Sequence, residues 1–110
     1  MRLPNGDRAS VDIAKLRDYC LDTSHWRGRH KARVFATALG ITAADAEWLR
    51  DALIAAARAE DAIPSDADQY GQRFVVEFEL IGPMGTAMIR SRWIVRTGED
   101  YPRLSTCYVV

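Results

Sequence analysis

Apolar residues recur every three or four positions in the first half of the chain, which is the spacing of amphipathic helices. Asp12 can cap a first, short helix. A second helix is predicted over residues 29–39, followed by Gly40 in the position where helices commonly end. Thr42 and Asp45 have the spacing of a capping box and predict the start of a third helix. The predicted core-facing positions of the three helices are Ile13, Leu16, Cys20, Ala32, Phe35, Ala36, Leu39, Ala46, Leu49, Leu53, Ala56 and Ala57.

The period of the hydrophobic pattern changes to two from Gln72 onward. The third helix is predicted to end before residues 63–66, which include Pro64 and precede this change. Strict alternation is typical of a strand with one buried face. The predicted buried positions of this strand are Phe74, Val76, Phe78 and Leu80.

A second alternating run over 89–96 follows a turn whose two-residue loop is predicted at Met84 and Gly85. This loop would pair Glu79 with Arg90, Glu77 with Arg92, Val76 with Trp93 and Phe74 with Val95. A closing strand is predicted over 103–110. Residues 1–110 are therefore predicted to form a single α+β domain, in which N-terminal helices pack on an antiparallel sheet of three or more strands.

The charges of the chain cancel, with 15 basic and 15 acidic residues. This balance argues against a protein that holds long nucleic acid by bulk electrostatics, because such domains carry a basic excess. The distribution is nevertheless uneven: residues 1–40 hold eight Lys or Arg against four Asp, whereas residues 41–69 hold seven acidic residues against two Arg.

No apolar run is long enough to span a membrane and no secretion signal is recognised, so a cytoplasmic protein without membrane contact is expected. Cys20 and Cys107 have no CxxC spacing and are expected to be reduced thiols. No metal or other cofactor is expected, because the His and Cys residues lack the spacing of a zinc site.

The first candidate site is the start of the second predicted helix, where both histidines lie among basic residues. Free N–H groups at a helix start favour an anion, so Arg29 and Lys31 at this place suit a bound phosphate. His25 and His30 could divide the roles of general base and general acid, and Trp26 could stack on a base. The alternative is a solvated basic loop in which a histidine caps the helix.

The second candidate site is the last predicted strand. Thr106 and Tyr108 share one of its faces, and Arg103 precedes them. A pair of hydroxyl groups beside a basic cluster can bind and orient a phosphate. The alternative is an ordinary strand, because Thr and Tyr are both good strand formers.

Several motifs in this order resemble a small family of uncharacterised bacterial domains, which occur alone or as C-terminal domains of toxin-like and phage-head proteins. The motifs are residues 15–19, 25–32, 70–71, 82–85, 93–94 and 100–108. The resemblance implies a distant relation to metal-independent RNases of the barnase, EndoU, colicin and RelE type. EndoU-like members use two histidines, a lysine, a hydroxyl residue and a tyrosine, which correspond here to His25, His30, Lys31, Thr106 and Tyr108. Lys31 directly follows a histidine, whereas those enzymes place the lysine farther along.

Two functions follow as hypotheses. The first is a metal-independent endoribonuclease toxin of a toxin/antitoxin or contact-dependent system, which cleaves RNA through a 2′,3′-cyclic phosphate and is inhibited by a small acidic antitoxin or immunity protein. In it the two histidines transfer protons, while Lys31, with Arg29 or Arg103, stabilises the phosphate charge. The second is a binding module without catalysis, such as an immunity or antitoxin protein or a component of a phage or mobile-element complex, whose acidic segment covers a basic partner.

Overall fold

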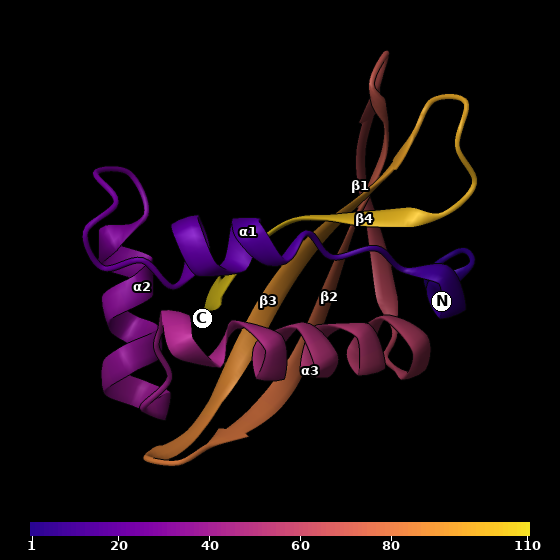
Figure 1. The fold of residues 1–110 in the computed structure, drawn as a ribbon. Coiled ribbons are helices and arrows are strands. Elements are labelled where there is room, and N and C mark those ends of the chain that lie inside the picture. Colours follow the sequence, from indigo (N-terminus) through magenta and orange to yellow (C-terminus); the bar gives the residue numbers. More distant parts are fainter.

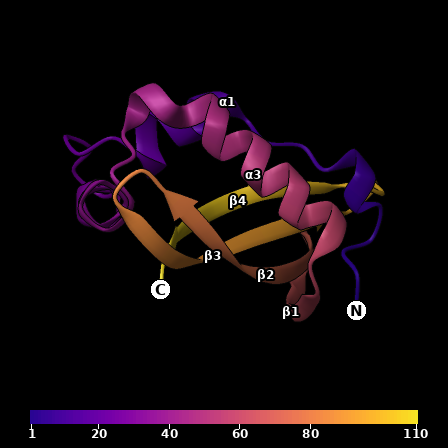
Figure 2. The same ribbon diagram turned by 90° about the horizontal axis from the view of Figure 1, so that it is seen from below.

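The computed structural model describes residues 1–110, and Figure 1 shows helices crossing one face of a four-stranded antiparallel sheet. The helical segments are η1 Gly6–Arg8, α1 Ile13–Lys15, η2 Leu16–Cys20, α2 Arg29–Val34, η3 Phe35–Leu39, η4 Ala43–Asp45 and α3 Ala46–Ala59. The strands are β1 Ala62–Asp68, β2 Gly71–Gly82, β3 Gly85–Arg96 and β4 Pro102–Val109. They are neighbours in chain order, and Figure 2 shows α1 and α3 on the same side of them. The predicted α+β fold, with N-terminal helices packed on the sheet, is confirmed.

The three predicted helices form, each with the cap that its sequence provides. At the start of α1, Asp12 Oδ1 accepts a hydrogen bond from the Ala14 amide at 3.0 Å. Thr42 and Asp45 form the predicted capping box ahead of α3. Gly40 ends η3 with a φ of 73°, a left-handed conformation that glycine adopts without a side-chain penalty. None of the helices combines the length and the apolar composition that spanning a membrane requires.

The β2–β3 hairpin has the predicted faces but not the predicted register. Its two-residue loop is Pro83 and Met84, because Gly82 pairs with Gly85. The observed pairs are Glu77 with Arg90, Glu79 with Met88, Val76 with Ser91 and Phe74 with Trp93. The predicted register is therefore wrong by two residues. A two-residue shift leaves every side chain on its original face, so the alternation of the sequence could not distinguish the two registers.

The third helix ends at Ala59, before residues 63–66 as predicted, but these residues lie in a strand, β1, that was not predicted. This strand pairs only with β2, and every residue in it except Ala62 is exposed. Pro64 is acceptable because an edge strand needs to donate hydrogen bonds on one side alone. A polar, exposed edge strand has no alternation of hydrophobic residues by which it could be recognised.

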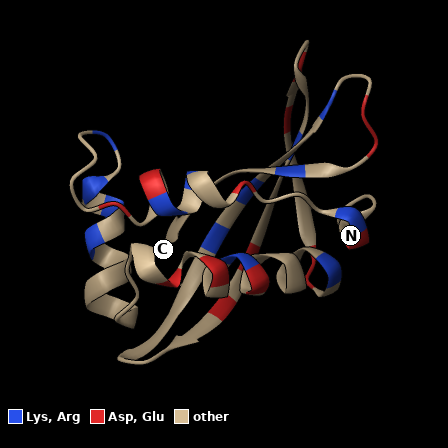
Figure 3. Cartoon of the chain, in the orientation of Figure 1, with Lys and Arg blue, Asp and Glu red and all other residues tan.

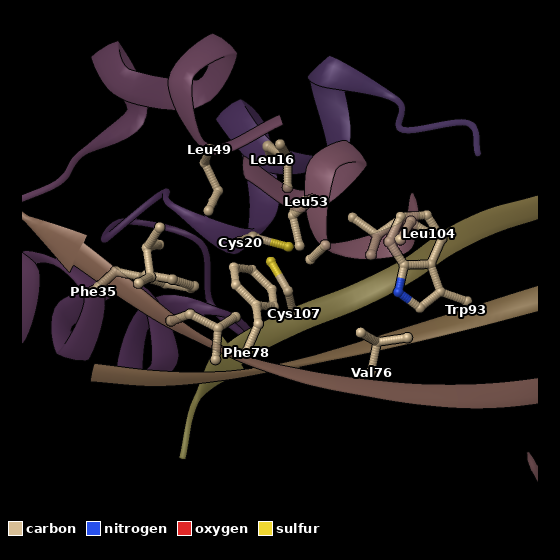
Figure 4. Packing of buried hydrophobic residues seen from close by; sticks show 14 of the residues in the cluster. Leu16, Cys20, Phe35, Leu49, Leu53, Val76, Phe78, Trp93, Leu104 and Cys107 are labelled. Carbon is tan, nitrogen blue, oxygen red and sulfur yellow. The ribbon is translucent and has the colours of Figure 1, made fainter. Parts of the chain in front are cut away.

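The core lies between the helices and the inner face of the sheet (Figure 4). Its largest fully buried side chain is Trp93. The only buried polar residue is Ser91, whose hydroxyl donates to the Val76 carbonyl at 2.7 Å and accepts from the Trp93 indole at 2.9 Å. Figure 4 also shows the sulfur atoms of Cys20 and Cys107 facing each other, and both residues are buried free thiols.

Candidate functional site

A pocket of about 560 Å³ opens between the first helix, α2 and β4. It is lined by Asp12, Ala14, Lys15, Tyr19, Lys31, Ser105 and Thr106. Two ammonium groups, two aliphatic hydroxyls and a phenol therefore meet in one concave place, and the single carboxylate among them caps α1. Positive charge combined with several hydrogen-bond donors is the chemistry that binds a phosphate.

Backbone hydrogen bonds hold the segment before α1 against the outer edge of β4. The Ser10 amide donates to the Pro102 carbonyl at 2.9 Å, and the Leu104 amide donates to the Ser10 carbonyl at 2.9 Å. Farther along, Lys15 Nζ donates to the Leu104 carbonyl at 3.4 Å. This bridge covers part of the strand edge and places the first helix beside Thr106, so that the helix forms one wall of the pocket.

Tyr108, next to this pocket on β4, is surrounded by cationic side chains. Lys31 Nζ lies 4.3 Å from the centroid of its ring, which is a cation–π contact. Arg92 Nε donates to its hydroxyl at 3.1 Å, and Arg90 is its cross-strand partner. Burial raises the pKa of this phenol, but hydrogen bonds and positive charge from Arg92 and Arg90 outweigh burial, so the pKa of Tyr108 lies below its ordinary value. The phenol therefore releases its proton more readily than a free tyrosine.

Neither Lys31 on α2 nor Arg92 on β3 has a carboxylate partner. Arg90, by contrast, lies 3.4 Å from Glu77. Arg92 donates to the hydroxyl of Tyr108 and lies near its ring, and Lys31 lies over the same ring. Figure 3 shows Lys and Arg positions on both α2 and β3. Two positive charges beside the pocket are thus available to an anion.

His25 lies at the margin of the pocket, where its ring meets the ring of Tyr19 edge to face with centroids 4.7 Å apart. Its Nδ1 atom accepts hydrogen bonds from the backbone amides of Arg27 and Gly28 at 3.1 and 3.2 Å. These bonds hold the loop before α2, whereas α2 itself, with Gly28 at its N-cap position, begins without a side-chain cap. In the neutral ring the bonds to Nδ1 leave the hydrogen on Nε2, which can donate a hydrogen bond toward solvent or a ligand.

The remaining predicted residues lie outside the pocket lining. His30 is exposed on α2, and Trp26 is 69% exposed in the preceding loop. Arg29 Nη1 donates to the Trp26 carbonyl at 2.9 Å, which fixes the loop at the start of α2. Arg103 makes hydrogen bonds of 2.9 and 2.8 Å to Glu99, so its charge is already balanced by a carboxylate.

Lys15, Tyr19 and Arg92 belong to the site but were not predicted as functional. Lys15 and Tyr19 are four positions apart, so the first helix presents both on one face toward the pocket. That spacing, within the motif at 15–19, was the signal that could have identified them. Arg92 alternates with the core residues of β3 and so shares the outer face of the sheet with Tyr108, which only the true strand pairing reveals.

Comparison with known proteins gives a family and a fold. The model of a family described as "Domain of unknown function (DUF6883)" matches residues 2–110. A chain from a structure described as "Contact-dependent growth inhibition toxin - immunity protein complex from Klebsiella pneumoniae 342" is similar, with a TM-score of 0.70 and 19% sequence identity over 91% of this chain and 98% of that chain. No curated protein matches the sequence. An identity of 19% establishes a shared fold alone, and the expected relation to barnase-type RNases stays a prediction.

Proposed function

The chain belongs to the DUF6883 family, and we propose that it is a metal-independent endoribonuclease of the toxin type, which cleaves RNA at the pocket between η2, α2 and β4. The observation that carries the proposal is the meeting of Lys31, Thr106 and Tyr108, which come from distant parts of the sequence. The similar fold in a complex of a growth inhibition toxin and its immunity protein supports a toxin or immunity role. A small acidic antitoxin or immunity protein is the partner that a toxin of this kind requires.

In this proposal an RNA phosphate lies between the ammonium groups of Lys15 and Lys31. Both charges face the phosphate before the reaction begins, so they stabilise the added negative charge of the pentacoordinate transition state without reorganising. The hydroxyl of Thr106 donates to a phosphate oxygen and fixes its orientation. Trp26, exposed in the adjacent loop, stacks on a neighbouring base.

The proton transfers are assigned from the state of each side chain. Tyr108, whose pKa is lowered by its arginine neighbours, takes the proton of the ribose 2′-hydroxyl as that oxygen attacks phosphorus. The departing 5′-oxygen receives a proton from His30, which is exposed on α2 next to Lys31 in the sequence. The product is a 2′,3′-cyclic phosphate. His25 retains a positioning role through its contact with Tyr19.

The direct test is digestion of total RNA and of a labelled single-stranded RNA in the presence of EDTA. We expect Lys31→Ala and Tyr108→Phe each to lower the cleavage rate by about 100-fold or more, since each removes a group that acts in the transition state. Arg33→Ala is the matched control, because it removes another exposed charge from the same helix. It should leave the rate within about twofold of wild type.

Two results would count against the proposal. Intact RNA after incubation with folded wild-type protein would show that the protein does not cleave RNA. Equal rates for wild type, Lys31→Ala and Tyr108→Phe would show that RNA is not cleaved at this pocket. A wild-type rate for His30→Ala would show only that another group donates the proton to the 5′-oxygen. Thermal unfolding of each variant shows whether a lost activity reflects a lost fold.

A binding module without catalysis is the second candidate, and the position of the acidic residues favours it. Figure 3 shows several Asp and Glu positions along α3, whereas the charged positions of α2 are Lys and Arg. Glu47 and Asp51 are exposed on this helix, and Glu60 is exposed just after it. For this function, neutralising those three residues should weaken binding of a basic protein partner, while His30→Ala should not.

A further inference from the structure

The strand β2 is paired along its whole length with β3, but along only part of its length with β1. The β1–β2 pairing begins at Gly71 and stops where Val76 lies opposite Ala62. Figure 1 shows the rest of β2 continuing past the start of β1 toward the hairpin tip, with no strand on that side. Residues 77–80 therefore form an open strand edge within the sheet.

The backbone groups exposed on this edge can be identified from the pairing at its end. The Ala62 amide donates to the Met1 carbonyl, and the Met1 amino group lies 3.4 Å from the Ala62 carbonyl, so both groups of Ala62 point away from β2. The backbone N–H and C=O groups of Val76, the partner of Ala62, therefore point toward β3. Because bonding direction alternates along an antiparallel strand, the N–H and C=O groups of Glu77 and Glu79 point to the open edge.

An apolar groove lies beside the same edge, between β2 and α3. It has a volume of about 270 Å³ and is lined by Ala52, Ala55, Ala56, Glu60, Phe78, Glu79 and Leu80. The short alanine side chains leave room above Phe78, which faces the core side of β2. A side chain of the size of valine or leucine fits this volume.

We propose that the edge 77–80 accepts an extended, basic segment of a partner protein as an added antiparallel strand. Its backbone continues the line of β1 and bonds to Glu77 and Glu79. A residue opposite Phe78 points into the groove and is apolar. The residues on either side of it lie opposite Glu77 and Glu79 on the outer face of the sheet, so they are Lys or Arg. The recognised sequence is thus a basic residue, an apolar residue and a basic residue.

The choice of a basic partner rests on the charges along the edge. Glu79 and Glu60 take part in no ion pair, and both line the groove. Glu77 has an ion pair at 3.4 Å with Arg90, which stands on the far side of β2 from the edge. An acidic partner would place like charges opposite each other, which is unfavourable across paired strands. This site does not depend on the pocket beside β4 or on its chemistry.

The test uses the full chain, labelled with ¹⁵N, and the synthetic peptide Thr-Lys-Val-Lys-Val-Lys-Thr. We expect saturable amide shifts centred on Glu77, Glu79 and the alanines of the groove, with slower hydrogen exchange at the two glutamate amides. Methylating the lysine backbone nitrogens should weaken binding by about tenfold or more, since these nitrogens face β2 in the proposed pairing. Methylating the valine nitrogens, which face away, should change the affinity by less than about threefold.

Two substitutions complete the test. Glu79→Lys should lower the affinity for the peptide by about tenfold. Asp18→Lys, which makes the same change of charge on η2, should leave the affinity within about twofold of wild type. Absence of binding at millimolar peptide, equal binding of the peptide with Glu in place of Lys, or equal effects of the two methylated peptides would overturn the proposal. So would shifts confined to β1. Self-association of the free chain that Glu79→Lys abolishes would mean that a second copy, not a basic partner, occupies the edge.

Discussion

Removal of the Ser91 hydroxyl should destabilise the protein through the group that it leaves unpaired. Ser91 and Trp93 are both 0% exposed, and the hydroxyl is the hydrogen-bond acceptor of the buried indole N–H. Ser91→Ala leaves that N–H without a partner, which costs about 1–3 kcal/mol in the free energy of unfolding. Loss of the bond to the Val76 carbonyl adds less, because Val76 lies within the β2–β3 ladder.

A double-mutant cycle separates the cost of the unpaired indole N–H from the other effects of Ser91→Ala. In a Trp93→Phe background no buried N–H is left unpaired, so Ser91→Ala should destabilise by about 1 kcal/mol less than it does in the wild type. Urea unfolding followed by far-UV circular dichroism measures all four proteins without relying on tryptophan fluorescence. Thr86→Ala, at an exposed position of the same strand, controls for loss of a hydroxyl. Equal effects of Ser91→Ala in both backgrounds would refute the reasoning.

Three further predictions concern single side chains. Asp12→Ala should lower the free energy of unfolding by about 1 kcal/mol in urea denaturation, because it removes the cap of α1. Hydrogen bonds and charge from Arg103 outweigh burial and lower the pKa of Glu99 to about 2. The contribution of Glu99 to stability is therefore complete above the ordinary carboxyl pKa and is lost as pH falls toward 2. Carboxyl NMR titration should show the low pKa, and Arg103→Ala should return it toward 4.5. Ultraviolet titration should place the pKa of Tyr108 below its ordinary value of 10, and Arg92→Ala should raise it, whereas an unchanged value would contradict the assigned role of that arginine.

The parts of the fold that local chemistry determines could be predicted from the sequence. The helix starts at Asp12 and Thr42 follow from side chains that satisfy backbone amides within three residues. The alternation of β2 follows from one buried face. By contrast, β1 forms because its backbone pairs with a strand that comes later in the chain, and nothing in its own exposed residues requires this.

The candidate site was predicted in part for the same reason. Lys31 and Tyr108 could be selected by residue type, but their contact depends on how α2 is placed against β4. The neutralisation of Arg103 by Glu99 depends on the turn between β3 and β4, whose conformation the sequence did not specify. Lys15 was overlooked because a lysine on a short helix is usually solvated, and only the bridge between Ser10 and β4 turns it toward the pocket.

The most direct measurement of the central claim is the chemistry of the RNA ends. Folded wild-type protein, freed of metal with EDTA, should convert a labelled oligoribonucleotide to fragments that end in a 2′,3′-cyclic phosphate and begin with a 5′-hydroxyl, as mass spectrometry would identify. An otherwise identical substrate with 2′-O-methyl groups should stay uncut, because it lacks the proton that Tyr108 is proposed to take. Cleavage of the methylated substrate, or fragments with 3′-hydroxyl and 5′-phosphate ends, would contradict the account.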